Sequence, residues 1–510
     1  MKKPVLASLV IIAISTSACV QQDLQTTNPG IAIGDEDIGG EARALYYRQR
    51  IAEIDDAGPR LNAVISLNPQ VAAQTRAAAA SGLPLAGRTV LVKDNIETRE
   101  LPTTAGSLSL AGNNTRRDAP LIERMRANGG VVLGKTNLSE WANIRSTNST
   151  SGWSAVGGQT KNPHALDRNP CGSSSGSGAA VAAGLSWAAI GTETDGSITC
   201  PASVNGIVGF KPTVGMVSRT HVVPISHSQD TAGPMTRSVR DAAMLLNAIA
   251  GSDPLDPATA EADTRMTDFT TGLASASLGG KRIGVLRKQA GERADVIRIF
   301  EQAIADMRAA GAKIVEVEYE PSEAMGRDEY TVLLYELRED LGKYLAASPA
   351  DIPVRSLADV IEFNAANPGE EMRFFGQEIF LLSEQTTDRE AYLAARSNSL
   401  RLAGTDGIDK LLAENRVDFL VAPTTGPAWP IDLVYGDNYP GSIGAGNLAA
   451  IAGYPHLTVP MGSVEGLPVG LSFLGAKWKD HSILQAGAAY ERARSAQLLS
   501  PNLQILRLVD

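Results

Sequence analysis

The sequence predicts an α/β fold in which helices cover both faces of a mixed β-sheet core, within one domain over residues 41–510. Short apolar or alternating runs, typical of strands, are separated by segments whose apolar residues recur at helical spacing. Residues 321–415 have an almost entirely helical pattern, which indicates a helical insertion. No Pro-, Gly- or Ser-rich linker divides the folded part, so we expect a single domain.

The first part of the chain alternates between helices and short strands. Apolar residues recur at helical spacing from Ala44 to Ile54, and Gly58 follows that segment. Asp118 is expected to cap a later helix, which Gly129 ends. The expected helices are about 44–54, 70–80 and 118–128, and the expected strands are 61–67, 89–93 and 131–133.

The same alternation continues toward the C-terminus and is interrupted by the helical insertion at 321–415. We expect this insertion to help cover the functional site. The remaining expected elements are helices at about 241–250 and 293–309 and strands at 282–286, 313–319, 417–422, 456–461 and 469–474.

Composition and charge exclude several classes of protein. The chain has 510 residues, of which 43% are apolar and 20% charged, so it is long enough to bury a large core. A net charge of −10 argues against a nucleic-acid partner, because phosphate binding depends on basic surface. The five histidines are scattered and lack cysteine or carboxylate partners at ligand spacing, so we expect no metal and no cofactor.

Residues 1–19 have the pattern of a signal peptide. Lys2 and Lys3 precede an apolar run that is too short to span a bilayer, and small residues then lead to Cys19. Cleavage before Cys19 would expose it for lipid attachment, although Thr16 stands where lipoprotein signals usually carry leucine. The polar residues 20–40 are typical of a flexible tether. We therefore expect an exported protein, either periplasmic, secreted or lipid-anchored to the cell envelope.

Two serine clusters and one lysine have residue types that suit nucleophilic catalysis. Ser197 lies in a glycine-assisted turn whose N–H groups could converge on an oxyanion. Ser173 belongs to a serine run before an apolar helix, where unpaired N–H groups favour negative charge. Lys93 ends an apolar run, so burial could lower its pKa and keep part of it neutral. These three residues suit a nucleophile, a proton relay and a base.

The segments GSSSGSGAAVAAG and GTETDGSITCPAS resemble the signature of the amidase signature family. Ser173 and Ser197 lie 24 residues apart, and Lys93 stands in a K-D-N motif, as in that family. The resemblance implies a signature core at about 85–240 and a Ser-Ser-Lys triad that hydrolyses amides through an acyl-enzyme. It also implies a cis peptide bond at the relay serine and an oxyanion hole built from the backbone of Thr194, Asp195, Gly196 and Ser197.

Other segments resemble the peptide amidases of that family, which release ammonia from C-terminal peptide amides. These segments are LSEWANIR at 138–145, GWSAVGGQTKNP at 152–163 and ISHSQDTAGPM at 225–235. Asp195, Thr199 and Ser175 depart from the broad family pattern but suit this branch. The likeness implies that Asn143 and Asp195 face the substrate, although Asn143 could simply cap a turn and Asp195 could form one.

Several alternatives stay open or are opposed by their context. Small aliphatic or aryl amides are alternative substrates to peptide amides. A tRNA amidotransferase subunit would work in a cytosolic complex, which the export signal opposes, and the intact triad opposes a non-catalytic surface binding protein. Residues 172–176 match the G-x-S-x-G elbow, with Ser174 as nucleophile, and residues 129–136 match the P-loop pattern. Both matches lack the strand and helix context that such motifs need.

Cys171 and Cys200 flank the proposed relay and nucleophile, so the site would bring them into one neighbourhood. In an oxidising compartment they could form a disulfide. Two buried thiols that pack as small apolar groups are an equally suitable interpretation.

Overall fold

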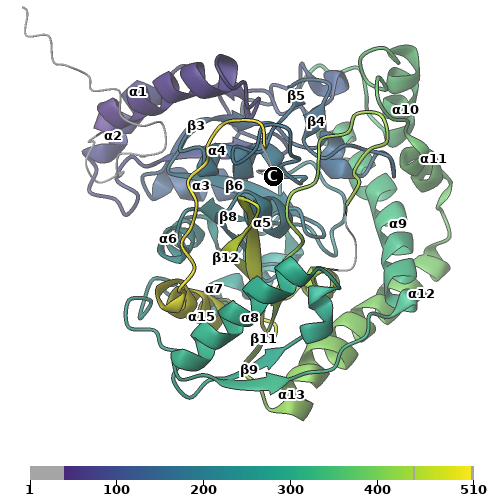
Figure 1. The fold of residues 1–510 in the computed structure, drawn as a ribbon. Helices are drawn as coiled ribbons and strands as arrows, with labels where there is room; N and C mark the ends of the chain where they lie inside the picture. Colours follow the sequence, from purple (N-terminus) through teal and green to yellow (C-terminus); the bar gives the residue numbers. More distant parts are fainter. Residues whose placement is uncertain (1–39, 440–442, 507–510) are drawn as a thin grey trace, which may run out of the picture.

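The computed structural model describes residues 40–439 and 443–506. The predicted signal peptide, Cys19 and nearly all of the predicted tether lie outside the described residues. The central element is a mixed sheet of eleven strands in the order β1-β3-β2-β6-β8-β7-β12-β13-β11-β9-β10 (Figure 1). The prediction of a mixed sheet in an α/β domain is confirmed.

The strands run through the whole described chain, which explains why no linker divides it. Strand β2 pairs in parallel with β3 and β6, whereas β6, β8 and β7 pair in antiparallel fashion. The sheet consists of β1 (Val64–Leu67), β2 (Thr89–Lys93), β3 (Val131–Thr136), β6 (Ala188–Glu193), β7 (Val208–Lys211), β8 (Thr231–Thr236), β9 (Arg282–Val285), β10 (Lys313–Glu316), β11 (Phe419–Pro423), β12 (His456–Val464) and β13 (Leu467–Leu474), and a separate hairpin of β4 (Trp153–Ser154) and β5 (Gly158–Gln159).

Helices surround the sheet, and those of residues 321–415 run along one side of it (Figure 1). The helices outside that subregion are α1 (Gly40–Arg50), α2 (Val71–Ala79), α3 (Pro120–Ala127), α4 (Ser175–Ala182), α5 (Thr199–Val204), α6 (Val239–Ile249), α7 (Ala262–Arg265), α8 (Ala294–Ala309), α14 (Gly446–Ala452) and α15 (Asp480–Ala493). The predicted helical insertion is α9 (Glu323–Ala347), α10 (Leu357–Ala366), α11 (Glu378–Gln385), α12 (Arg389–Leu400) and α13 (Lys410–Asn415).

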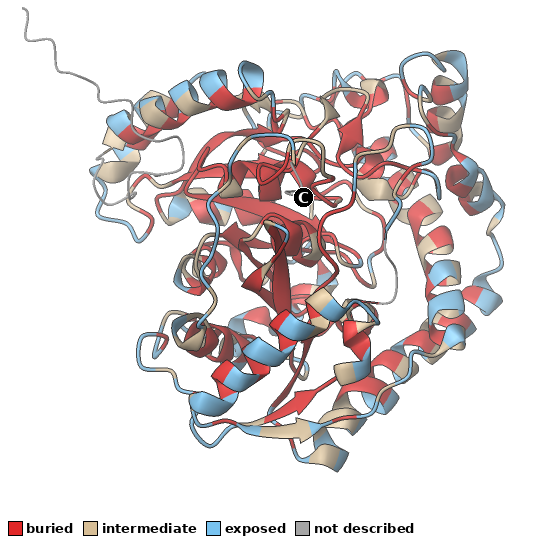
Figure 2. Cartoon of the chain, viewed as in Figure 1, coloured by how far each residue is buried: buried red, intermediate tan, exposed pale blue. Residues whose placement is uncertain are grey.

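Strand β2 shows how both faces of the sheet are buried. Val90 and Val92 pack in one hydrophobic cluster with Leu245 of α6, whereas Leu91 belongs to another cluster with Tyr47 of α1. Alternate residues of a strand point to opposite faces, so helices cover the sheet on both sides. Figure 2 shows the resulting pattern, with buried strands inside and helices whose outer sides are exposed. The strand that ends in Lys93 is therefore shielded from solvent along its whole length.

One local expectation was wrong. Helix α3 begins at Pro120 with Ala119 in the N-cap position, so Asp118 does not cap it. Proline at the first helical position has its φ preset, which places the helix start there. The Asp118 carboxylate instead accepts a hydrogen bond from Arg99 N at 3.0 Å and pairs with Arg126 Nε at 2.9 Å.

Strands β6, β7 and β8 were not among the predicted elements. Strand β6 has the sequence AAIGTE and β8 has TAGPMT, which are rich in residues with low strand propensity. Their strand conformation comes from pairing with neighbouring strands. No helix among the described residues combines the length and the apolar character needed to cross a membrane.

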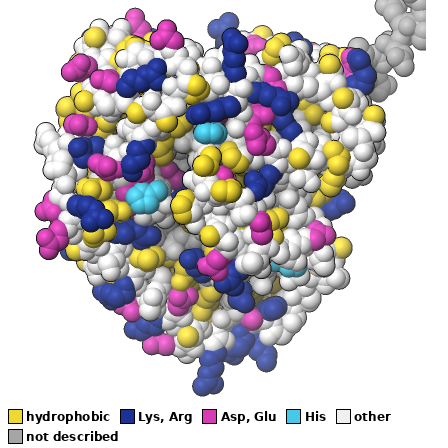
Figure 3. All heavy atoms as spheres, turned by 180° about the vertical axis from the view of Figure 1, so that it is seen from behind, with side chains coloured by type: hydrophobic (Ala, Val, Ile, Leu, Met, Phe, Trp, Pro, Cys, Tyr) yellow, Lys and Arg dark blue, Asp and Glu magenta, His cyan; other side chains and the backbone are white. Residues whose placement is uncertain are grey.

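On the face shown in Figure 3, basic and acidic side chains are interspersed. This arrangement does not resemble the basic surface that a nucleic acid requires.

Candidate active site

Lys93 lies at the end of β2 and is completely buried. Its Nζ donates to Ser173 Oγ at 2.7 Å and to Thr192 Oγ1 at 2.8 Å. Burial lowers the pKa of Lys93 to about 7, although the nearby carboxylates of Asp230 and Glu193 act in the opposite direction. The structure thus places a lysine that can lose its proton near neutral pH against one serine hydroxyl.

Ser173 follows a cis peptide bond between Gly172 and Ser173, as the family resemblance implied. Its carbonyl oxygen accepts a hydrogen bond from Ser139 N at 3.0 Å. A side chain at position 172 has no room, because a Cβ on Gly172 would lie 2.1 Å from Ser139 Oγ. Close packing around the loop therefore directs the Ser173 hydroxyl toward Lys93.

Ser197 lies in the turn between β6 and α5. Gly196 has a φ of 76°, in the left-handed region that favours glycine. The Glu193 carboxylate accepts hydrogen bonds from Ile198 N at 2.8 Å and Thr199 N at 2.9 Å, so it satisfies N–H groups at the start of α5. Ser197 is 9% exposed. Together these contacts define the shape of the segment 194–197, in which we expected the oxyanion hole.

Two links join the loop that carries Ser173, the proposed relay loop, to the turn at residues 194–197, the proposed nucleophile turn. Ser174 N donates to Ser197 O at 3.1 Å. Cys171 and Cys200 form a disulfide with a Cα–Cα distance of 6.0 Å. The structure thus decides between the two interpretations of the cysteines, and the thiol alternative was wrong.

A cavity of about 570 Å³ opens beside the nucleophile turn. Asp195 and Gly196 line it on the side of the turn, and polar side chains line much of the rest. The other residues that line it are Thr199, Cys200, Lys288, Gln289, Glu320, Pro321, Thr424, Thr425, Tyr439, Ile443, Gly444, Gly446, Asn447 and His456. This size is typical of a site for a small molecule or for the end of a peptide.

Asp195 is exposed to the cavity, yet the protein around it raises the pKa of its carboxyl group well above the usual range. Loss of hydration is the main cause, and the neighbouring carboxylates of Glu329 and Glu193 add to it. Glu329 lies on α9, and burial raises its pKa to about 7. Gln229 Nε2 donates to Glu329 Oε1 at 2.9 Å. Asp195 and Glu329 are therefore interacting carboxyl groups, and the pKa of each is raised.

Asn143 ends a short 3₁₀ helix (Glu140–Asn143) and has a φ of 72°. Its Oδ1 accepts a hydrogen bond from Ser149 Oγ at 2.9 Å. The structure does not place Asn143 among the residues that line the 570 Å³ cavity. The turn role that the sequence also allowed is consistent with this position.

The two competing motifs do not form the sites that they resemble. Ser174 is fully buried, and its hydroxyl donates to Thr192 O at 3.0 Å, so it is engaged within the fold. The P-loop match at 129–136 lies in β3, which follows helix α3. A working P-loop would open a helix instead.

Several residues of the site were missed from the sequence. Thr192 and Glu193 stand inside the signature segment, but they had no distinguishing spacing. Asp230 accepts a hydrogen bond from Thr194 Oγ1 at 2.6 Å, although 36 residues separate the two in sequence. Glu329 is more distant still. Asp230 lies in the segment 225–235 whose resemblance was noted, but nothing in the sequence paired it with Thr194, and nothing singled out Glu329, because only the packing of the sheet and α9 creates these contacts.

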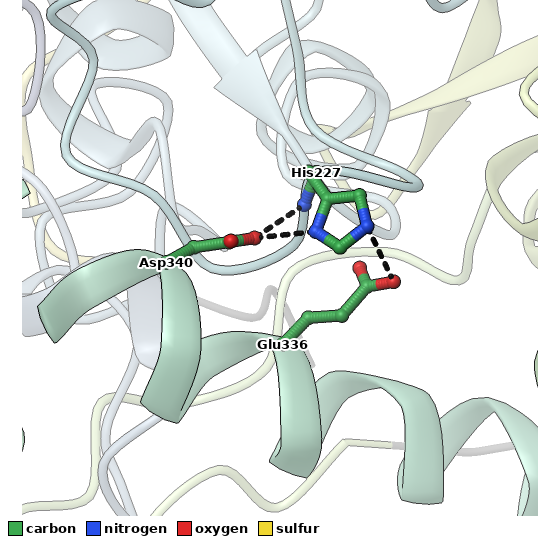
Figure 4. A group of neighbouring side chains, drawn as sticks. All are labelled: His227, Glu336 and Asp340. Atoms are coloured by element: carbon green, nitrogen blue, oxygen red, sulfur yellow. Dashed lines mark hydrogen bonds and ion pairs between the residues drawn. The ribbon is translucent and has the colours of Figure 1, made fainter. Parts of the chain in front are cut away.

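A further group was also unexpected. His227, Glu336 and Asp340 form, within residues 40–439 and 443–506, a cluster of the kind that could hold a metal ion (Figure 4). The imidazole lies between the two carboxylates, with Nδ1 2.7 Å from Asp340 Oδ2 and Nε2 3.3 Å from Glu336 Oε1. The hydrogen bond to Asp340 raises the pKa of His227. Because Glu336 also accepts hydrogen bonds from Ser228 and Tyr392, we interpret the group as an ion-pair cluster.

Comparison with known proteins agrees with this geometry. A family model described as Amidase matches residues 46–484. A probable amidase from Arabidopsis thaliana is 38% identical over 481 residues, which cover 91% of this chain and 88% of that protein. A glutamyl-tRNA(Gln) amidotransferase subunit from Thermus thermophilus is 36% identical over 486 residues, 90% of this chain and 95% of that protein. The native peptide amidase from Stenotrophomonas maltophilia is 48% identical with a TM-score of 0.87, over 92% of this chain and 96% of that one.

The fold and these similarities define the class of protein: it is a hydrolase that acts on amide C–N bonds. The chain belongs to the amidase family, the family that its serine-rich segments resembled. The likeness to peptide amidases is confirmed at the level of the structure.

Proposed function

We propose that the protein removes ammonia from C-terminally amidated peptides, with Ser197 as nucleophile, Ser173 as proton relay and Lys93 as base. The observation that carries this proposal is the 2.7 Å hydrogen bond between Lys93 Nζ and Ser173 Oγ inside the protein. A buried lysine with a pKa of about 7 is neutral often enough to accept a proton at physiological pH.

The proposed reaction has two stages. Ser197 Oγ attacks the amide carbon, and its proton passes through Ser173 to neutral Lys93. Backbone N–H groups of residues 194–197 stabilise the oxyanion of the tetrahedral intermediate. The C–N bond then breaks, and the proton returns to the departing nitrogen, which leaves as ammonia. Water attacks the acyl-enzyme by way of the same relay and releases the peptide acid and free Ser197.

The substrate class rests on two supports. One is the 48% identity to a peptide amidase over nearly the whole of both chains. The other is the cavity of about 570 Å³ beside Asp195 and Gly196, which has room for the C-terminal residue of a peptide. Asp195 lines this cavity, and in the proposed complex its carboxyl group accepts a hydrogen bond from the amide NH₂ of the substrate. The resemblance also implied that Asn143 contacts the substrate. We propose that it contacts the bound peptide outside this cavity.

The test is ammonia release from a C-terminally amidated peptide by the protein without residues 1–19. We expect Ser197→Ala to abolish release, and an internal peptide bond of the same substrate to stay uncut. Ser186→Ala is the matched control, because Ser186 is also buried but donates to Thr89 O at the far end of β2. Equal release by wild type and Ser197→Ala would refute the role of Ser197.

Three alternative functions have separate outcomes. Turnover of small aliphatic or aryl amides without turnover of peptide amides would identify the protein as an amidase of small amides. The similarity to an amidotransferase subunit from Thermus thermophilus supports an amidotransferase role as an alternative. Co-purification with further subunits and ATP-dependent transfer of ammonia would favour that role, and a non-catalytic binding protein would release no ammonia from any amide.

We also propose that the protein is exported and that Cys19 becomes the first residue after signal cleavage. The disulfide between Cys171 and Cys200 supports export, because such bonds persist in oxidising compartments. Mass spectrometry of the mature N-terminus would identify the cleavage site and any lipid on Cys19. Retention of Met1 in a cytosolic fraction would contradict the proposal.

A further inference from the structure

Asp230 closes the loop 225–230 onto the nucleophile turn. One carboxylate oxygen accepts hydrogen bonds from Ile225 N at 2.8 Å and Ser226 N at 2.9 Å. The other accepts from Thr194 Oγ1 at 2.6 Å. Asp230 is only 8% exposed, so these contacts lie inside the protein. Its carboxylate therefore connects the loop to the first residue of the proposed oxyanion hole.

The charge of Asp230 also acts on the proposed base. Asp230 and Glu193 are the two carboxylates that favour the charged form of Lys93. The adjacent Asp94 differs, because it pairs with Lys135 at 2.9 Å. The cation that lowers the pKa of Asp230 is Arg219.

Arg219 does not neutralise Asp230 through a direct pair. Its guanidinium binds Asp256 in a two-point contact, with Nε 2.8 Å from Oδ2 and Nη2 2.6 Å from Oδ1. Burial raises the pKa of Asp230 to about 6, so it carries its charge in the range where Lys93 becomes neutral. The charge of Asp230 is consequently available to Lys93.

The outer side of the same loop is held by the helical subregion (Figure 4). Glu336 of α9 is fully buried and accepts hydrogen bonds from Ser228 N at 3.0 Å, Ser228 Oγ at 2.5 Å and the Ser226 hydroxyl. One helical turn away, Asp340 accepts from His227 N at 3.0 Å. Tyr392 of α12 donates to Glu336 Oε1 at 2.7 Å. The loop is thus fastened between α9 and the nucleophile turn.

We infer that Asp230 is a positioning residue for the amide-hydrolysing site, which holds Thr194 by a hydrogen bond and whose negative charge acts on Lys93, and that Glu336 holds the loop that carries Asp230. The inference deepens the proposed function and depends on it for the kinetic readout. Asp230 acts through Thr194 and Lys93, and it needs no contact with the substrate. The helical subregion thereby influences the catalytic turn without contributing a reacting group.

Two variants separate the charge of Asp230 from its geometry. In Asp230→Asn the amide group lacks the charge. If its Oδ1 accepts from Ile225 N and Ser226 N, its NH₂ group faces Thr194 Oγ1, so the Thr194 hydroxyl loses its acceptor and must reorient. We expect kcat for ammonia release to fall at least about tenfold, since a single oxyanion donor is worth about 10²- to 10³-fold, with little change in KM. The acid limb of the pH profile should move to lower pH, because Lys93 loses a neighbouring negative charge. Asp230→Glu keeps the charge but not the geometry, so it should lower kcat with the acid limb near its wild-type position.

Glu336→Gln tests the outer anchor, and Glu339→Gln is its matched control. Glu339 lies on the same helix but pairs with Arg338 at the surface. We expect the first variant to lower kcat without raising KM and the second to behave as wild type. Melting temperatures of all variants identify any general loss of folding. Equal kcat for Glu336→Gln and Glu339→Gln would overturn the role of Glu336.

A direct titration of Lys93 keeps the inference testable whatever the substrate. Lysine labelled with ¹³C at Cε reports the protonation midpoint of Lys93, with Lys93→Met for assignment. A lower midpoint in Asp230→Asn supports the inference, whereas an unchanged midpoint together with unchanged kcat overturns it. If wild type releases no ammonia from any amide, the proposed function fails, and the Lys93 midpoint still decides whether Asp230 acts on that residue.

Discussion

Loss of the disulfide between Cys171 and Cys200 is the change whose effect on stability and activity can be worked out most fully. Cys171 precedes the relay loop, and Cys200 lies in α5 just after the nucleophile turn. The bond thus joins the two segments that carry Ser173 and Ser197. Reduction, or replacement of both cysteines by serine, removes this link and leaves the sheet that supports Lys93 intact.

The expected cost follows from the length of chain that the disulfide closes. The cysteines are separated by 29 residues. Closing a loop of that length removes about 12 cal/mol/K of entropy from the unfolded chain, or about 3.6 kcal/mol at 25 °C. For a chain of 510 residues the entropy of unfolding is about 1 kcal/mol/K, so the melting temperature should fall by about 3–4 °C.

The assay combines calorimetry with ammonia release. The phosphine TCEP should lower the melting temperature and kcat of wild type and leave the Cys171→Ser/Cys200→Ser double variant unchanged, which makes the variant its own control for side effects of the reductant. Mass spectrometry after alkylation must show two free thiols in reduced wild type. A melting temperature that stays constant after verified reduction would refute the loop-entropy reasoning. Constant kcat would refute the link between the two catalytic segments.

The remaining predictions concern the relay and the buried charges. The rate of ammonia release should rise with pH through about 7 as Lys93 loses its proton, and a rate that is flat from acid to alkaline pH would contradict the role of neutral lysine. Ser173→Ala should abolish turnover with little loss of substrate binding, which a competitive inhibitor can check. Lys93→Met should be inactive. The difference in free energy of unfolding between wild type and this variant should depend on pH. Between about pH 7 and 10.5 the unfolded wild type holds a proton that native Lys93 has lost. The free energy of unfolding of wild type should therefore rise relative to the variant by up to about 1.4 kcal/mol per pH unit, as measured by urea titrations. Arg145→Met should cost roughly 3–5 kcal/mol in the same assay, because Glu140, which pairs with Arg145 Nε at 2.8 Å, would stay buried without its partner.

Much of the fold follows from patterns that are short along the chain. The run TVLVK predicted β2 with its observed bounds, and the helical spacing of residues 321–415 predicted the helical insertion, which contains five α-helices. Strands β6 and β8 could not be predicted in this way, because their alanine, glycine and proline residues have low strand propensity and adopt strand conformation here through pairing with neighbouring strands. Local propensity predicts strands well where apolar residues dominate, and poorly where pairing with neighbouring strands determines the conformation.

For the candidate site, too, some features follow from the local sequence and others only from the tertiary structure. The sequence by itself determined the residue types and spacing of Ser173, Ser197 and Lys93, since the serine-rich signature is local. Only the tertiary structure decided that Lys93 is fully buried against Ser173, that the two cysteines are bonded, and that Asp230 and Glu336 hold the loop 225–230 between Thr194 and α9. The physical reason is that burial, pKa and hydrogen bonding depend on which distant segments the sheet brings together. Glu336 and Ser226 are 110 residues apart in the chain, and no local pattern encodes their contact.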